Sequence, residues 1–158
     1  MAEVNGAVER KEMKVIIFQL MDKEYAIEVD VVEAIEKLLP ITKVPKTPSY
    51  VKGVINLRGV VTPIVDLRER FGLEVKSLDD SSRIIIVSLD EFEVGLIVDA
   101  ANDVIDIPVD SIEPQPEVVG AVESEFISGV AKIDKRLLVM LNLEKVLQPI
   151  KRMTSDEL

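Results

Sequence analysis

The sequence predicts a mainly β fold in which two small antiparallel barrels pack together as one body. Of its 158 residues, 47% are hydrophobic and only 4% are aromatic, so valine, isoleucine and leucine, which favour short strands, dominate the apolar part. Short apolar runs alternate with turn residues along the chain. The order of these runs in the first half returns in the second half. A chain of this length buries roughly 70% of its unfolded surface, which is enough for a well-developed core.

Hairpins account for most of the predicted strands. Apolar runs joined by turn residues predict hairpins over residues 15–29, 52–65 and 84–98. Their turns are centred on Asp22, Arg58-Gly59 and Asp90-Glu91. In the second half, Asp134-Lys135 takes the place that Arg58-Gly59 has in the first. Each half therefore supplies five short strands, the number that a small barrel needs.

Carboxylate side chains mark the starts of two short helices. Asp30, with Glu33 three residues later, predicts a helix over residues 31–37. Asp66 predicts a second helix of fewer than two turns, which Gly72 ends. Both helices are too short to form a layer of their own, so they serve as connections between strands.

The two halves of the sequence match at nearly constant offsets. Asp30 matches Asp99 at an offset of 99 − 30 = 69 residues, and Asp99 is accordingly assigned to a helix cap. Gly53 matches Gly129 at an offset of 129 − 53 = 76 residues. The difference falls in the proline-rich segment 108–122, which we expect to be a longer loop. The repeat favours two barrels of similar construction.

The repeat also sets the expected domain boundaries. Residues 1–12 lack periodicity and are expected to be a flexible tail. Residues 13–150 form a single domain of two barrels, at about 15–72 and 83–148, between which strands can be exchanged. Residues 151–158 are assigned to a second tail.

The composition removes most catalytic chemistry. The chain has no Cys, His or Trp, which excludes disulfides, thiol nucleophiles, Cys or His metal sites and imidazole acid–base catalysis. Its formal charge of −10 argues against a nucleic-acid surface, because such surfaces neutralise phosphates with Lys and Arg. No apolar run approaches the roughly 18 residues of a membrane span, and no signal peptide begins the chain. We expect a cytoplasmic protein that uses no metal and no cofactor.

One hairpin stands out as a candidate binding site. Arg58, beside Gly59, places a guanidinium at a hairpin tip, where it suits a carboxylate of a partner. Asn56 can brace the turn, and Gly53 permits close approach of another backbone. The alternative for Arg58 is an ordinary exposed turn residue.

These residues resemble the CheW coupling proteins of bacterial chemotaxis. The segment Gly-Val-Ile-Asn-Leu-Arg-Gly at 53–59 and the segment Pro-Ile-Val-Asp-Leu at 63–67 are similar to the most recognisable stretch of that family. The resemblance extends from about Met13 to Gln148. It implies two SH3-like five-stranded barrels packed around a shared core, with short linker and C-terminal helices.

The resemblance also implies a function. It indicates a non-enzymatic adaptor that couples chemoreceptors (methyl-accepting chemotaxis proteins) to the histidine kinase CheA. The partners would be the regulatory domain of CheA and the cytoplasmic tip of the receptor, with no insertion into the membrane. Such an adaptor is cytoplasmic and is recruited to membrane-associated receptor arrays.

Two sets of site residues follow from the resemblance and from one feature of the sequence. Residues 15–20 are apolar on both faces, one face more than a small barrel needs, so part of them should join an exposed patch. The receptor-binding residues are predicted to be Arg58, Gly53, Asn56, Val32 and Val104. The kinase-binding residues are predicted to be Ile16, Val29, Val32 and Ile35. Val32 belongs to both sets.

Two other functions remain open at this point. The chain can be the detached regulatory domain of a CheA-type kinase, since that domain has a similar fold in the family. A carboxylate-dependent hydrolase requires a deep pocket with two close acids, one of them with a raised pKa.

Overall fold

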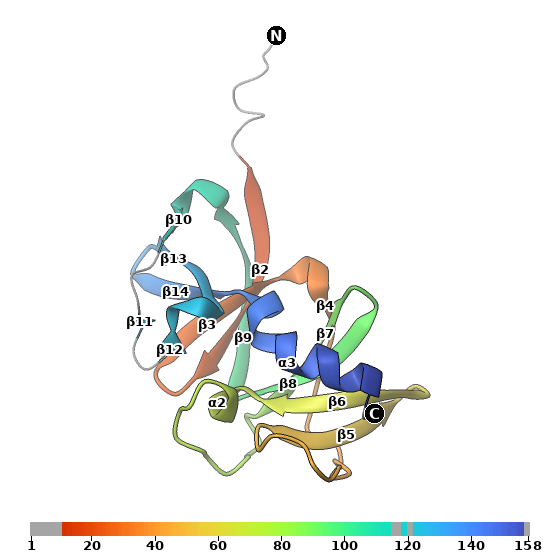
Figure 1. The fold of residues 1–158 in the computed structure, drawn as a ribbon. Coiled ribbons are helices and arrows are strands. Elements are labelled where there is room, and N and C mark those ends of the chain that lie inside the picture. Colours follow the sequence, from red (N-terminus) through yellow and green to blue (C-terminus); the bar gives the residue numbers. More distant parts are fainter. Residues whose placement is uncertain (1–10, 115–117, 120–121, 157–158) are drawn as a thin grey trace.

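The computed structural model of the chain describes residues 11–114, 118–119 and 122–156 (Figure 1). The predicted tail at 1–12 lies outside these residues except for its last two, and Glu12 already begins a strand. The predicted tail at 151–158 differs from the structure, because helix α3 (Leu143–Asp156) continues through most of it. Residues 157–158 lie outside the described part.

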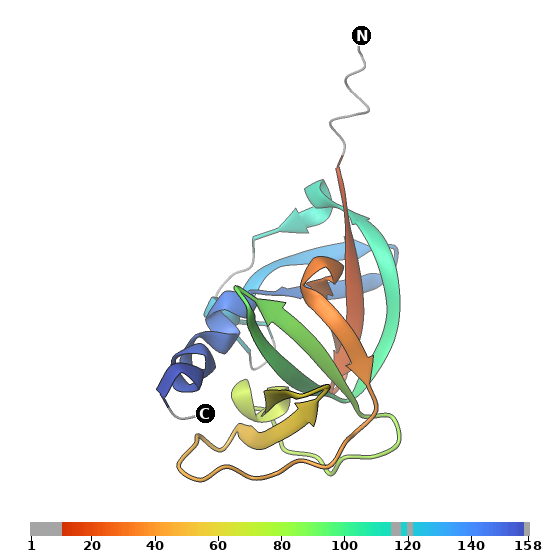
Figure 2. The ribbon, with the colours of Figure 1, turned by 90° about the vertical axis from the view of Figure 1, so that its right-hand side faces the viewer.

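The first barrel is built on a six-stranded sheet with the strand order β10-β13-β14-β3-β2-β9. Its strands are β2 (Glu12–Leu20), β3 (Lys23–Glu28), β9 (Ala100–Pro108), β10 (Ile112–Glu113), β13 (Ile127–Ile133) and β14 (Arg136–Leu141). The two edge strands, β9 and β10, follow one another in the chain and are joined by a single 3-10 turn, Val109–Ser111. The sheet therefore curls round on itself (Figure 2). A short pair, β11 (Val118–Val119) with β12 (Val122–Glu123), lies in the predicted long loop.

The second barrel is built on a five-stranded sheet with the order β4-β7-β8-β6-β5. Its strands are β4 (Val32–Glu36), β5 (Val51–Leu57), β6 (Val60–Asp66), β7 (Arg83–Leu89) and β8 (Phe92–Val98). The predicted mainly β fold of two barrels is confirmed. The barrels are not the two sequence halves 15–72 and 83–148, however, because β2 and β3 pair with late strands and β4 pairs with β7. The exchange of strands that the sequence left open does occur.

Apolar residues fill both faces of the central strands because a shared core lies between the barrels. In β7, Ile84 and Ile86 point into the second barrel, whereas Ile85 and Val87 join the core that both barrels share. In β2 the same alternation places Ile17 inside the first barrel and Phe18 in the shared core. The second apolar face of residues 15–20 thus packs between the barrels and is not exposed. Burial of each large apolar side chain on this face stabilises the fold by about 2 kcal/mol.

The predicted helix at 31–37 is wrong. The segment forms a 3-10 turn, Val29–Val31, followed by strand β4. Strand β4 pairs antiparallel with β7, so Ile35 lies opposite Ile85. The capping pattern of Asp30 is a local signal of about 1 kcal/mol, and the backbone hydrogen bonds and packing that β7 offers outweigh it.

Asp99 is not a helix cap either. Strand β9 follows it directly, and its carboxylate binds Arg68 and the backbone N–H of Met21 instead. The prediction relied on the repeat, in which Asp99 matched Asp30, and neither residue begins a helix in the structure.

The helix start at Asp66 is as predicted. Asp66 caps helix α2 (Leu67–Arg70), and its carboxylate accepts a hydrogen bond of 2.9 Å from the N–H of Arg68. Gly72 follows this helix with φ of 75°, a conformation that glycine adopts without strain. Asn142 precedes α3, and its side-chain oxygen accepts a hydrogen bond of 3.2 Å from the N–H of Lys145.

Arg70 links helix α3 to the rest of the fold through ring contacts and hydrogen bonds. Its guanidinium lies 5.0 Å from the ring centre of Tyr50 and 4.6 Å from that of Phe126. It also donates to the backbone oxygen of Val146 at 2.8 Å. Pro149, inside the helix, has no N–H for the carbonyl of residue 145, and Arg70 reaches that carbonyl at 3.5 Å. The arginine therefore compensates for a helix bond that the proline removes.

Replacing Arg70 with methionine is expected to lower the free energy of unfolding by about 2 kcal/mol, because two ring contacts and a charged hydrogen bond are lost. Urea denaturation measures this loss, and amide hydrogen exchange should show faster exchange in α3. Arg83 provides the control, since its bonds within the described part of the chain go to carbonyl oxygens of the preceding loop, at residues 80 and 82. Equal losses in Arg70→Met and Arg83→Met would contradict the linking role.

Candidate partner-binding site

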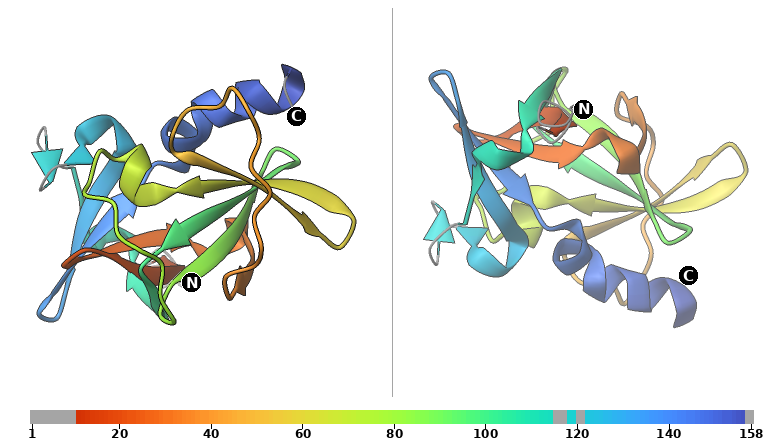
Figure 3. Two further views of the ribbon diagram at one scale, coloured as in Figure 1. Left: turned by 90° about the horizontal axis from the view of Figure 1, so that it is seen from below. Right: turned by 90° about the horizontal axis from the view of Figure 1, so that it is seen from above.

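The hairpin of β5 and β6 presents Arg58 at its tip. Arg58 and Gly59 form a two-residue turn with φ of 54° and 84°, values that match the favoured twist of such hairpins. The side-chain oxygen of Asn56 accepts a hydrogen bond of 2.9 Å from the N–H of Gly59 and braces the turn. Arg58 is exposed, and Figure 3 shows the hairpin projecting from the body of the molecule. The predicted roles of Asn56 as a brace and of Arg58 as a tip residue agree with this geometry.

Two valines beside the turn leave the tip apolar. Val60 and Val61 are 49% and 59% exposed, whereas Leu57, on the other strand, packs against the interior of the second barrel. The tip therefore offers one cation next to an apolar surface. Sequence reasoning missed the valines, although β-branched residues directly after the turn could have indicated them.

Gly53 does not lie on this surface. It is buried with φ of 142°, and a Cβ at this position would lie 2.1 Å from the backbone oxygen of Thr42. The chain at Thr42 uses that space to exchange hydrogen bonds of 2.8 and 2.9 Å with Val54. Gly53 thus allows the backbone at Thr42 to pair with the hairpin, in agreement with the predicted close approach of another backbone.

The remaining predicted residues lie on faces that the two barrels turn toward each other. Val32 packs against the shared core, and Ile35 lies beside Ile85, which belongs to that core. On the first barrel, Val104 lies opposite Ile16. Ile35 and Val104 are 43% and 50% exposed, so they are accessible at the outer edge of the layer between the barrels. Figure 2 looks onto this side and shows β4 in front, with β9 beside it and the β5–β6 hairpin below.

The structure does not separate the two predicted sets. Ile16 is only 5% exposed and is not part of an exposed patch, because neighbouring strands cover it. Val29 and Val32 are half-buried, and Ile35 is exposed. Val32 and Ile35, from the kinase set, belong to β4, and Val104, from the receptor set, belongs to β9, and both strands run along the side seen in Figure 2.

An ion pair joins the barrels where the chain passes from the second to the first. Arg68 donates to both carboxylate oxygens of Asp99, at 2.8 and 2.5 Å, and their side chains are only 11% and 15% exposed. Asp99 also accepts from the N–H of Met21 at 2.8 Å, in the turn between β2 and β3. No local sequence pattern indicates this pair, since its members are 31 residues apart.

The pair changes the titration of its members. Burial raises the pKa of Asp99, but the hydrogen bonds from Arg68 and Met21 oppose it, and the resulting pKa is below the ordinary value of an aspartate. The hydrogen bonds that Arg68 donates to Asp99 raise the pKa of Arg68, and its burial opposes this. Burial raises the pKa of Asp66, against the hydrogen bonds that its carboxylate accepts from backbone N–H groups.

Among the described residues, Asp66 is not placed as one of a pair of hydrolytic acids. Asp66 has the raised pKa that a hydrolytic site requires, yet its carboxylate caps α2. A hollow on the second barrel lies beside Asp66, and Asp66 is the single acid among the described residues that line it. The described part of the chain also holds no group of three or more Asp and Glu side chains placed to bind a metal. No helix within the described residues is long and apolar enough to cross a membrane.

The chain is similar to proteins of bacterial chemotaxis. The family model described as CheW-like domain matches residues 14–151. Chemotaxis protein CheW of Bacillus subtilis is 46% identical over 134 residues, which cover 85% of this chain and 86% of that protein. The CheW protein of Klebsiella aerogenes is 34% identical over 84% of this chain and 80% of its own. In three dimensions, the crystal structure of the scaffolding protein TtCheW from Thermoanaerobacter tengcongensis superposes with a TM-score of 0.82 at 37% identity, covering 87% of this chain and 94% of that one.

Proposed function

This chain belongs to the CheW family and is a chemotaxis adaptor, and we propose that the two partners it joins are the cytoplasmic tip of a chemoreceptor and the regulatory domain of the histidine kinase CheA. It does so without chemistry of its own, and it works in the cytoplasm at membrane-associated receptor arrays. The relatives reported above are named chemotaxis or scaffolding proteins rather than kinases, which favours the adaptor over a detached kinase domain.

One observation carries the proposal: a braced turn holds Arg58 out in solvent, and strands β4 and β9 expose Ile35 and Val104. A receptor tip is a pair of helices in the family, and exposed apolar side chains with one adjacent cation suit a helix that carries a carboxylate. We assign Arg58, Asn56, Val32 and Val104 to the receptor, with Gly53 acting only as a support.

The kinase contact is assigned to Ile35 with Val29 and the exposed part of Val32. Ile16 is buried, so its assigned role is to support the kinase-binding surface and not to contact the kinase directly. Each contact can be modest in area, since binding to two linked partners raises the effective concentration of each at the other.

Arg58→Glu is expected to weaken binding to a receptor cytoplasmic fragment at least tenfold, about 1.4 kcal/mol, and to leave the fold intact. The fold should survive because Arg58 is exposed and Glu replaces one non-glycine residue by another at the same positive φ. Isothermal titration calorimetry with the receptor fragment measures the loss, and thermal unfolding checks the fold.

The matched control is Lys135→Glu, which makes the same charge change at the exposed turn between β13 and β14. It should bind the receptor fragment as the unchanged protein does. Titration with the CheA regulatory domain should show little change for either variant. Undiminished receptor binding by Arg58→Glu would remove the receptor role of Arg58.

A further inference from the structure

A hollow on the second barrel, away from the β5–β6 tip, has an apolar floor. Its volume is about 360 Å³, and Ile97, which is 3% exposed, forms part of its floor. Ile41 lines one side, and Val75 and Leu78, in the loop between α2 and β7, line the other. These two loop residues are 59% and 45% exposed. Two large apolar side chains thus stand in solvent beside an apolar hollow.

The loop that carries them is held in place. The N–H of Leu73 donates to the oxygen of Arg68 at 2.8 Å, and Arg68 in turn donates to the oxygen of Glu74 at 2.8 Å. At the other end, the N–H of Asp79 donates to the hydroxyl of Ser82 at 3.0 Å. Val75 and Leu78 lie between these fixed points, so the entropic cost of ordering the loop when a ligand binds is small.

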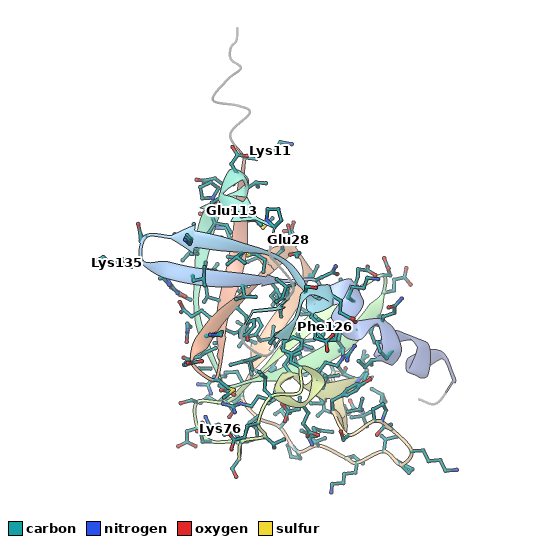
Figure 4. All side chains as sticks on the ribbon, turned by 60° about the vertical axis from the view of Figure 1, so that its left-hand side comes forward. Lys11, Glu28, Lys76, Glu113, Phe126 and Lys135 are labelled. Carbon is teal, nitrogen blue, oxygen red and sulfur yellow. The ribbon has the colours of Figure 1, made fainter. Side chains whose placement is uncertain are left out.

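Three lysines surround the hollow, in a chain whose net charge is −10. Lys52 is paired with Glu69, and Lys76 with Asp79 at 3.2 Å. Lys43 is exposed and forms no ion pair with the described residues. The single acid of the lining, Asp66, is 5% exposed and occupied as a helix cap. Figure 4, in which Lys76 is labelled, shows this loop at the lower part of the molecule, well below Lys135 of the first barrel.

We propose that this lysine-rimmed hollow binds a peptide segment of a partner protein that carries a large apolar side chain flanked by carboxylates. A volume of about 360 Å³ is at the small end of ligand pockets, which range over roughly 300–1,000 Å³, and so suits one anchoring side chain. Lys43, which forms no ion pair with the described residues, supplies the complementary charge, which contributes to the association rate and to the choice of partner. The site is independent of Arg58 and of the proposed adaptor contacts.

The probe is a short synthetic peptide of glutamates with two central leucines, titrated into the isotope-labelled full chain. Chemical-shift changes are expected at Ile41, Val75 and Leu78. A second peptide with alanines in place of the leucines, and a third with lysines in place of the glutamates, should each bind at least tenfold more weakly.

Two charge-matched double variants locate the site. Lys43→Glu with Lys76→Glu should weaken binding of the leucine–glutamate peptide at least tenfold. Lys132→Glu with Lys135→Glu, at exposed positions of the first barrel, should leave it unchanged. Arg58→Glu should also bind the peptide normally, so failure here and failure of the adaptor assignment are distinguishable.

Several outcomes would overturn the proposal. If both double variants bound the leucine–glutamate peptide equally well, its binding would depend on the overall charge and not on this hollow. If the alanine peptide bound as tightly as the leucine–glutamate peptide, no apolar side chain would be anchored. Cosedimentation with phosphatidylglycerol vesicles that is lost only in the Lys43 and Lys76 variant would reassign the hollow to a membrane surface. Concentration-dependent shifts of Val75 and Leu78 without peptide would reassign it to a second copy of the chain.

Discussion

Gly53→Ala is expected to lower the free energy of unfolding by about 3 kcal/mol and the melting temperature by roughly 10 °C. A Cβ at this position meets the backbone oxygen of Thr42 at 2.1 Å and its carbonyl carbon at 2.7 Å, and backbone atoms yield less readily than the end of a side chain. The φ of 142° adds strain for any residue with a side chain. Thermal and urea unfolding measure both quantities.

Gly59→Ala is the matched control for this substitution. Gly59 also has a positive φ, of 84°, but a Cβ there meets nothing within 4 Å. It should cost only the strain of the backbone, about 1 kcal/mol. If the two variants lost equal stability, the segment at Thr42 would have to move aside at no cost, and its pairing with Val54 would not be a fixed part of the fold. Receptor binding should fall in Gly53→Ala only to the extent that the hairpin unfolds.

Asp99→Asn is expected to lower the free energy of unfolding at neutral pH by about 3 kcal/mol, because it leaves the guanidinium of Arg68 in a site that is only 11% exposed without its counter-charge. Asp106→Asn is the control. Its ion pair with Lys14 is 3.6 Å long, with both side chains more than half exposed, and such a pair is worth less than about 1 kcal/mol. A loss in Asp99→Asn no larger than in Asp106→Asn would show that the pair does not hold the barrels together.

The dependence on pH has a definite sign. The pKa of Asp99 is lower in the folded protein than its ordinary value of about 3.9, so the unfolded chain takes up a proton first as the pH falls. The contribution of Asp99 is therefore complete above about pH 5 and is lost as the pH falls through its folded pKa. Asp66 acts in the opposite direction, since its pKa is raised on folding. Between about pH 5 and pH 3, the unchanged protein should lose more stability than Asp99→Asn does, as measured by urea unfolding at each pH.

The hairpins were predictable because their signals are local. The residues Arg58-Gly59 and Asp90-Glu91 adopt positive φ at the turns where the sequence placed them. Strand β4 was not predictable in this way, since Asp30 and Glu33 satisfy a helix pattern and only the partner strand β7 decides against it. A local pattern cannot report a partner that lies about fifty residues further along the chain.

The site was predictable in part for the same reason. Arg58 and Asn56 belong to one turn, and the turn brings them together. Ile16 was misplaced because β9, a distant strand in the sequence, pairs with β2 beside it, and the pair of Arg68 with Asp99 exists only once both barrels are formed. The exposed Ile35 and Val104 were correctly placed near a surface, but their common side follows from the exchange of strands.

That exchange also sets an order of events during synthesis. The second barrel is one uninterrupted stretch, from β4 to β8, whereas the first barrel is divided into β2 and β3 before it and β9 to β14 after it. On the ribosome, the inserted barrel can close as soon as residue 98 has emerged, because all its strands are then present. The first hairpin, which carries Phe18 and Tyr25 of the shared core, must wait for β14 and β9, more than seventy residues later, and such non-local pairing is slow. The apolar flank of this early hairpin is the surface that a nascent-chain chaperone would be expected to shield.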